Sequence, residues 1–271
     1  MHQIDKEYVL LKINYLNQKM ERYLAVLDIL GYKSLLLNND LSEVQGLLDN
    51  IPVYVQGSLA EGKTISTNGQ VHYDVKNASI NSIIISDTFI FWTIDNSQVS
   101  LWGLIDCIYR LMQFCHNLPS LFLRGAIIYG EFIHKPTGYI LMNNGAIMSH
   151  PMIYGKGLIQ AYDIEKRQAI ANCLIQNEAI EKARESDPKA FEIEWSNLQS
   201  GHRIIHYEVP MKEGNLFPCW VINWVSQASN PTREKLLDKF SLYNRNTDDP
   251  SIQLKIINTV RFYDFVKQSQ A

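Results

Sequence analysis

Hydrophobic and polar positions along the chain form blocks that predict strands and helices in turn. The run Leu24–Leu27 is apolar without alternation, which is typical of a strand buried on both faces. It ends at an acid, Asp28; Gly31 then breaks the strand, and a helical pattern extends from Tyr32 to about Leu48. A buried carboxylate needs a neutralising cation, and a helix that begins beside it directs N–H groups that suit phosphate. The turn after Asp28 therefore predicts a place where carboxylate, metal and phosphate meet.

The next blocks predict an insertion, a hairpin and a long helix. Residues 49–79 are irregular and read as a loop insertion with one short strand near Val71–Val75. Two β-rich runs within Ile80–Ile94 flank Ser86 and Asp87, which predicts a hairpin whose turn type stays open. From Val99 to about Asn117, apolar residues recur at intervals of three and four, as in a helix.

Later blocks add further strands and helices. Their expected bounds are a strand Leu121–Gly130 paired in a hairpin with Tyr139–Met142, a helix opened by Gly155–Gly157 and running to about Arg184, strands Arg203–Val209 and Cys219–Val225, a helix after Pro231, and a helix Ile252–Gln268. The order β-α-β-β-α-β predicts an α+β fold with a ferredoxin-like core and appended C-terminal strands and helices. We expect residues 1–20 to form a helix or arm that packs on the domain or on a partner. Residues 21–271 then form one domain, with a core of about 22–185 completed by 186–271.

Composition narrows the class of protein. The 271 residues carry 25 basic and 28 acidic side chains, a net charge of −3, so we expect no nucleic-acid partner. No signal peptide is visible, and no apolar run approaches the roughly 18 residues that a membrane helix needs, so we expect a cytoplasmic protein without membrane contact. Four scattered cysteines lack metal-binding spacing and are interpreted as reduced core thiols; they are Cys107, Cys115, Cys173 and Cys219.

Two acids are placed to act together. Asp28 ends one strand, and the β-α-β-β order places the Asp87 hairpin next to that strand. Two acids that hold two divalent ions can activate one oxygen and neutralise a leaving phosphate. The competing interpretation is structural: Asp28 caps the helix and Asp87 fills a turn.

Four motifs in the same order resemble those of the class III nucleotidyl cyclases, the adenylate and guanylate cyclase catalytic domain. They are Asp28-Ile-Leu-Gly-Tyr32, Ser86-Asp87, Leu123-Arg-Gly-Ala-Ile-Ile-Tyr-Gly130 and Gly155-Lys-Gly-Leu-Ile-Gln-Ala-Tyr-Asp-Ile-Glu165. The match covers about residues 22–170. This pattern of motifs is most similar to that of the pyrimidine cyclases of bacterial Pycsar anti-phage systems, which make cyclic CMP or cyclic UMP.

The chain departs from the class III pattern at four positions. The Asn and Arg that steady the transition state fall on Ile159 and Asp163, which cannot replace them. The Lys and Asp that select a purine fall near Ile83 and Met152.

The resemblance implies a site and a reaction. Asp28, Asp87 and the carbonyl of Ile29 would hold two Mg²⁺ or Mn²⁺ ions, one activating the 3′-hydroxyl and one bridging the triphosphate. The substrate would contact Ser86 and the backbone from Leu30 through Gly31 and Tyr32 to Lys33, where Lys33 could add a charge. The product would be a 3′,5′-cyclic nucleotide and pyrophosphate.

Other polar residues have weaker assignments. Arg124 lies within an apolar strand and needs an anionic partner, either phosphate or one of Glu131, Asp163 and Glu165. Candidates for the missing cation are Lys156, Lys166 and Arg167, although solvated helix charge fits each of them. Tyr32 and Tyr162 could stack on a base or pack in the core. Three histidines show no ligand spacing; they are His116, His134 and His150.

The resemblance also implies a head-to-tail homodimer, in which the partner subunit supplies the wall that faces the base. Two alternatives to a cyclase stay open. A catalytically degenerate cyclase-fold protein would bind nucleotide or a partner without turnover, as the residues at Ile159 and Asp163 suggest. A polymerase or cyclic-dinucleotide synthase would share palm-like elements, but the balanced charge and the missing Gly-Gly-Asp-Glu-Phe motif argue against both.

Overall fold

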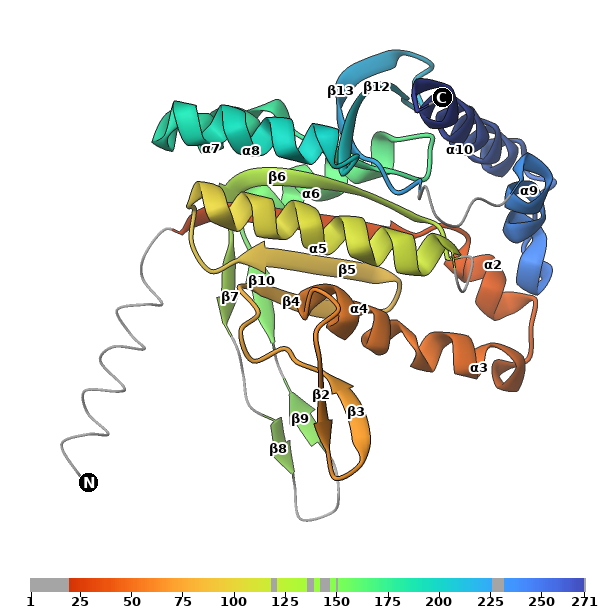
Figure 1. Ribbon diagram of the computed structural model, residues 1–271. Helices are drawn as coiled ribbons and strands as arrows, with labels where there is room; N and C mark the ends of the chain where they lie inside the picture. Colours follow the sequence, from red (N-terminus) through yellow and green to blue (C-terminus); the bar gives the residue numbers. More distant parts are fainter. Residues whose placement is uncertain are drawn as a thin grey trace.

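A seven-stranded mixed sheet is the centre of the molecule (Figure 1). The computed structural model describes residues 20–117, 121–135, 139–141, 147–149, 151–225 and 232–270. The strand order is β12-β13-β11-β6-β1-β5-β4, with only β6 and β11 pairing in parallel. The strands are β1 Glu21–Ile29, β4 Ile80–Ile85, β5 Thr88–Thr93, β6 Leu123–Glu131, β11 Cys173–Ile175, β12 Ile204–Pro210 and β13 Leu216–Ile222.

The ferredoxin-like core is confirmed. Strands β6-β1-β5-β4 are antiparallel neighbours, which is the arrangement that a βαββαβ chain adopts. Helix α5 (Gln98–Asn117) and helix α6 (Lys156–Arg167) lie on opposite faces of the sheet (Figure 1). Because both faces of β1 are covered, Tyr23–Leu27 are fully buried, which explains the unbroken apolar run in the sequence.

The predicted helix from Tyr32 to Leu48 is wrong as a single element. It divides into α2 (Tyr32–Leu37) and α3 (Leu41–Asp49), because Asp40 and Glu43 form a capping box that starts a new helix. The predicted loop insertion also contains α4 (Ile51–Leu59) and a hairpin of β2 (Thr64–Thr67) and β3 (Gln70–Tyr73), close to the one strand expected there.

The hairpin predicted between Leu121–Gly130 and Tyr139–Met142 is also wrong. Strand β6 uses both edges inside the sheet, pairing with β1 on one side and β11 on the other. Strand β8 (Tyr139–Leu141) pairs instead with β9 (Ile147–Ser149), and Met142 lies outside the described residues. A further pair consists of β7 (Ile133–Lys135) and β10 (Met152–Tyr154).

The long helix expected from Gly155 to Arg184 is two helices with a strand between them. Helix α6 ends at Arg167, β11 enters the sheet, and α7 (Asn177–Ser186) follows. Residues 169–175 are apolar apart from Asn172 and contain no Gly or Pro, so local pattern alone could not separate a buried strand from a continuing helix.

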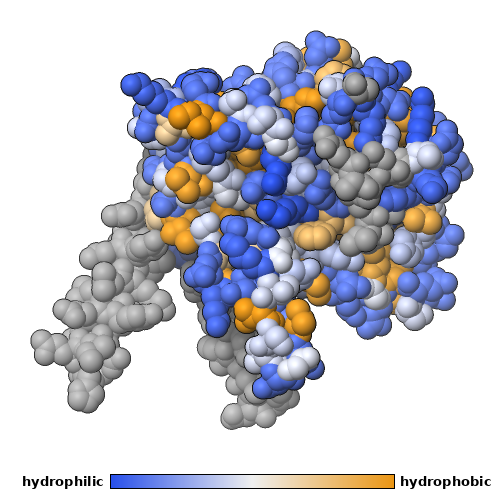
Figure 2. Space-filling view, in the orientation of Figure 1, coloured by the Kyte–Doolittle hydropathy of each residue, from blue (hydrophilic) through white to orange (hydrophobic). Residues whose placement is uncertain are grey.

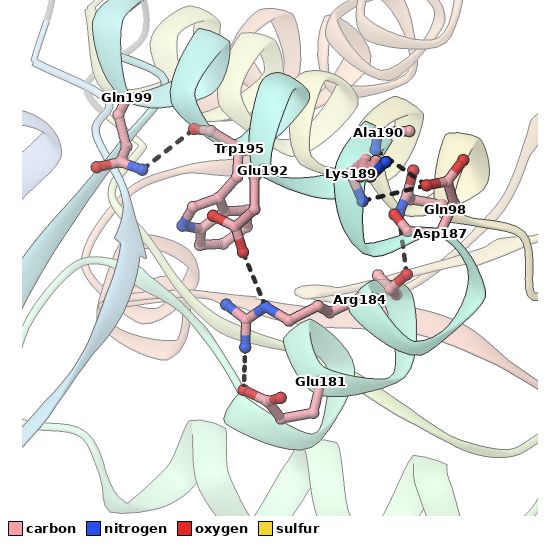
Figure 3. A network of polar contacts seen from close by, with 10 residues as sticks. Gln98, Glu181, Arg184, Asp187, Lys189, Ala190, Glu192, Trp195 and Gln199 are labelled. Carbon is pink, nitrogen blue, oxygen red and sulfur yellow. Dashed lines mark hydrogen bonds and ion pairs between the residues drawn. The ribbon is translucent and has the colours of Figure 1, made fainter.

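Helix α8 (Pro188–Ser200) was missed by the sequence interpretation, and Figure 3 shows how it joins α7. The side chain of Asp187 accepts hydrogen bonds from the amides of Lys189 and Ala190, both at 3.1 Å, and so caps α8. Arg184 pairs with Glu181 within α7 and with Glu192 of α8 across the joint. The buried amide of Gln98, at the start of α5, donates to the carbonyl oxygens of Ala183 and Asp187.

The C-terminal elements follow the prediction closely. Strands β12 and β13 pair as a hairpin, and α9 (Arg233–Ser241), η1 (Leu242–Asn244) and α10 (Pro250–Ser269) follow. All four cysteines are buried with free thiols, as expected. Among the described residues, no helix is long and apolar enough to cross a membrane. On the face drawn in Figure 2, hydrophobic residues occur as small groups among hydrophilic ones. The expected arm, residues 1–19, lies outside the described part.

Gly125, beside Arg124, has no room for a side chain. A Cβ atom there would lie 2.5 Å from the carbonyl oxygen of Val26 and 2.7 Å from Leu27 Cγ. We predict that Gly125→Ala lowers the free energy of unfolding by about 1–3 kcal/mol in urea denaturation, because β1 and β6 must separate. Gly103→Ala in α5 is the control; its Cβ would meet nothing closer than 3.5 Å, so no loss is expected. Equal stability of the two variants would contradict the close approach of β1 and β6.

Candidate functional site

The structure brings Asp28 and Asp87 together at one end of the sheet. Asp28 lies opposite Thr88 in the antiparallel pairing of β1 with β5. The Ser86–Asp87 turn, which comes immediately before Thr88 in the chain, therefore lies beside the end of β1. The amide of Ile29 donates a hydrogen bond to the carbonyl oxygen of Asp87 at 3.1 Å. Ser86 adopts a left-handed backbone, with φ of 58°, which makes the turn tight enough to place Asp87 beside the end of β1.

Some of the backbone groups after Asp28 are already used in hydrogen bonds within the protein. In an antiparallel strand the N–H and C=O of one residue point to the same side, so the Ile29 carbonyl faces Asp87. The amide of Leu30 points the other way and donates to the Phe122 carbonyl at 2.9 Å. Leu30 therefore has no N–H left for phosphate. Gly31, with φ of 78°, turns the chain into α2, where Lys33 is exposed and Tyr32 packs partly against the core.

Arg124 holds the site from the neighbouring strand. It lies opposite Asp28 in the pairing of β1 with β6, and only 6% of it is exposed. Its Nε donates to Glu165 Oε1, its Nη1 donates to the Gln168 carbonyl at 3.2 Å, and its Nη2 lies 3.7 Å from Asp28 Oδ2. Of the anionic partners considered from sequence, Glu165 is the one that pairs with Arg124, and it is itself buried.

Negative charge exceeds positive charge in this cluster. Asp28, Asp87 and Glu165 are three carboxylates. Among the described residues, Arg124 is the guanidinium that pairs with them, through Glu165 and more distantly Asp28. The pKa of Asp28 is raised to about 7, first by burial and then by the charges of Glu165 and Asp87, while Arg124 acts in the opposite direction. The cluster therefore favours binding of a cation or a proton.

The donor set fits Mg²⁺ or Mn²⁺. Two carboxylates and a main-chain carbonyl are hard oxygen ligands, and an excess of negative charge suits a divalent ion. Within the described residues, no group of three or more His, Cys, Asp or Glu side chains could hold a metal. The ions would therefore depend on phosphate oxygens and water to complete their coordination, as Mg²⁺ in nucleotide sites does.

Two lysines that the sequence interpretation missed lie at the edge of the cluster. Burial lowers the pKa of Lys212, in the turn between β12 and β13, and the charge of Arg124 lowers it further. Lys255, near the start of α10, has its pKa lowered by the same two causes. Both also feel the charge of Asp28. No local pattern marks either residue, because each reaches the site only through tertiary packing.

Tyr162, on α6, also belongs to the cluster. Burial raises its pKa, a hydrogen bond with Thr88 lowers it, and the charges of Glu165, Asp28 and Asp87 raise it. Its hydroxyl is therefore close enough to the carboxylates for their charges to act on it.

The other sequence candidates lie away from the cluster or have other partners. Lys156, Ile159 and Asp163 are exposed on α6, and Arg167 pairs with Glu213 at 3.0 Å. Lys166 lies over the Tyr162 ring. His116 is buried and accepts a hydrogen bond from the Leu123 amide, His134 packs on Trp92, and His150 lies outside the described residues. Glu131 is half-buried, and Met152 is exposed.

Comparisons with known proteins give structural likeness only. No family model matches the chain, and no curated protein matches it. The catalytic core of a rhodopsin-guanylyl cyclase with converted specificity, in complex with ATPalphaS, is 10% identical with a TM-score of 0.48; the alignment covers 76% of this chain and 96% of that one. Two structures of a bacterial light-regulated adenylyl cyclase are 13% and 12% identical, each with a TM-score of 0.48; each alignment covers 89% of this chain and 66% of that one. Because these identities and scores are low, the likeness by itself assigns no function to this chain.

The raised pKa of Asp28 predicts a site that costs stability when no metal is bound. A folded-state pKa of about 7, against 3.8 for the free side chain, means that stability is present below about pH 4 and is lost as pH rises to 7. We predict that Asp28→Asn is more stable than wild type by on the order of 2 kcal/mol at pH 8 in chelator, and hardly more stable at pH 4. That value is discounted because 27% of the side chain is exposed.

Urea denaturation at both pH values measures the difference. Asp163→Asn, on the exposed face of α6, is the control and should change stability at neither pH. Equal stability of Asp28→Asn and wild type at pH 8 would contradict the electrostatic account of the site.

Proposed function

We propose that the protein is a nucleotidyl cyclase, a phosphorus–oxygen lyase that converts a nucleoside triphosphate into a 3′,5′-cyclic nucleotide and pyrophosphate. The observation that carries the proposal is the meeting of Asp28 and Asp87 at the end of β1, within a cluster that has more negative than positive charge. In the reaction the 3′-hydroxyl loses its proton and attacks the α-phosphorus. The bond from that phosphorus to the β-phosphate oxygen breaks, and pyrophosphate leaves.

Different residues of the chain would bind the metal ions, bind the phosphates and position the carboxylates. Asp28, Asp87 and the Ile29 carbonyl would hold two Mg²⁺ or Mn²⁺ ions, which supply Lewis-acid activation of the hydroxyl and neutralise the leaving group. The amides from Gly31 to Lys33 and the ammonium group of Lys212 would receive phosphate oxygens. Arg124 is held by Glu165 and Gln168, so we assign it to positioning Asp28 rather than to contact with substrate.

We propose a pyrimidine nucleotide, CTP or UTP, as substrate. The positions at which class III cyclases select a purine fall near Ile83 and Met152, and neither offers a hydrogen-bonding side chain. The resemblance to Pycsar cyclases supports the same substrates, and with them a role for the product as a signal in anti-phage defence.

We further propose a head-to-tail homodimer. Residues Ile159 and Asp163 fall where class III cyclases carry the Asn and Arg that steady the transition state, and both are exposed on α6. Ile159 is a large apolar side chain with 64% of its surface exposed. A partner subunit that covers this face of α6 would bury Ile159 and complete the wall around the base.

The second candidate is a catalytically degenerate cyclase that binds nucleotide without turnover. Its support is that neither Ile159 nor Asp163 can stabilise a transition state. The lysines beside the cluster weigh against it, because Lys212 brings a cation to the site by another route.

Product analysis by mass spectrometry tests the reaction. With Mn²⁺ and each of the four nucleoside triphosphates, we predict cyclic product from CTP or UTP. Asp28→Asn and Asp87→Asn should each lose at least about 100-fold in rate, because each removes a metal ligand. Glu194→Gln, on the exposed face of α8, should retain full activity. Tight nucleotide binding with no cyclic product from any of the four would favour the degenerate cyclase.

Sedimentation tests the dimer. We predict that wild type is dimeric and that Ile159→Glu is monomeric and inactive while its melting temperature is unchanged, because a charge cannot be buried unpaired in the contact. The matched control is Ile193→Glu on α8, where 63% of the side chain is exposed against 64% for Ile159. That variant should stay dimeric and active. An active wild-type monomer would overturn the proposed assembly.

A further inference from the structure

The C-terminal helix α10 is anchored on the segment that carries the site. The buried side chain of Asn258 donates to the Ala169 carbonyl at 2.9 Å, and the amide of Ala171 donates to Thr259 Oγ1 at 2.9 Å. Both contacts join α10 to residues 168–172, which connect α6 to β11. We call residues 168–172 the junction segment.

The junction segment also holds Arg124 and the turn that carries Lys212. Its first carbonyl, that of Gln168, accepts the hydrogen bond from Arg124, and the Gln168 side chain donates to the Gly125 carbonyl at 2.7 Å. Gln168 forms a bridge with Met211, and the Lys212 amide donates to the Arg167 carbonyl at 2.7 Å. One short segment therefore fixes Arg124, the β12–β13 turn and α10 relative to each other.

Lys255 extends the anchored face of α10 toward the cluster. It lies one turn before Thr259, whose hydroxyl donates back to the Lys255 carbonyl at 2.7 Å. Residues three and four apart share a helix face, so Lys255 continues the buried row of Asn258, Thr259 and Phe262. The side chain is half-buried, whereas Arg261, on the outer face of the same helix, is exposed.

Positive charge gathers around Lys255. Burial lowers its pKa, the charges of Arg124 and Lys212 lower it further, and Asp249 and Asp28 act in the opposite direction. Asp249 already caps α10 through the amides of Ser251 and Ile252. In the part of the chain that the structure describes, neither Lys255 nor Lys212 has an ion-pair partner. The acids near Lys255 are a helix cap, Asp249, and a metal-ligand candidate, Asp28, so its ammonium group can pair with an anion that enters from solvent.

We propose that Lys255 binds the phosphate chain of the nucleotide, so that helix α10 of the same subunit forms part of the active site. The anion enters between Lys255 and Lys212, on the outer side of the Asp28 cluster. That the anion is a nucleotide rests on the proposed function; that Lys255 and Lys212 form a polyphosphate site rests on the hydrogen bonds that hold α10 and the β12–β13 turn against the connection between α6 and β11.

Binding of inorganic tripolyphosphate to the full chain, measured by calorimetry, tests the site without requiring turnover. We predict that Lys255→Gln weakens binding about tenfold, whereas Lys255→Arg keeps the charge and binds within about threefold of wild type. Arg261→Gln removes one positive charge from the same helix and should bind as wild type does, apart from a small general effect of charge. Unchanged melting temperatures of the variants show that the fold is intact.

Kinetics separate this proposal from the proposed function. If wild type forms a cyclic product, Lys255→Gln should raise KM for the nucleotide about tenfold, with rescue by Lys255→Arg. Product formation with unchanged KM and unchanged tripolyphosphate affinity in Lys255→Gln would overturn the role of Lys255 and leave the cyclase proposal intact. Lysine-dependent tripolyphosphate binding without any cyclic product would overturn the cyclase and leave the polyphosphate site. Failure of wild type to bind tripolyphosphate would overturn the site.

Discussion

An excess of carboxylate at the carboxyl end of β1 is the constraint on which the rest of the structure depends. Asp28, Asp87 and Glu165 converge there, and the single guanidinium of Arg124 neutralises mainly Glu165. Such a cluster costs stability, because a hydrophobic set of side chains of similar volume is often as stable or more stable, and clusters of this kind concentrate at functional sites. The pKa of Asp28, which is raised to about 7 chiefly by burial, shows that the charged form of this side chain is destabilised in the folded protein.

The elements around the cluster keep these charges in place. Gly125 allows β6 to approach β1 closely enough for Arg124 to lie opposite Asp28. The junction segment accepts hydrogen bonds from Arg124 and from Asn258 of α10, and so holds both in place. The C-terminal segment also returns to the turn after Asp28. The Asn246 amide donates to Ser34 Oγ at 2.8 Å, and Arg245 lies against Gly31. The region expected from sequence only to complete the domain therefore supports the site itself.

Local pattern was enough for the parts of the fold that are local. The Asp28 strand, the Ser86–Asp87 hairpin, helix α5 and helix α10 were all predicted because apolar spacing and turn residues define them. Strand β11 was missed because its apolar residues are compatible with a helix and become a strand only between β6 and β13. Lys212 and Lys255 were missed for the same kind of reason, since the junction segment brings them to Asp28 from distant parts of the chain.

We propose that Asp28 and Asp87 share a pair of divalent ions in the presence of a nucleotide. The most direct measurement is anomalous diffraction from crystals grown with Mn²⁺ and a non-cyclisable analogue of CTP. The account predicts two manganese peaks between the Asp28 and Asp87 carboxylates, with the Ile29 carbonyl among the ligands and the triphosphate on the side of Gly31. Nucleotide bound with no manganese at these carboxylates would contradict it.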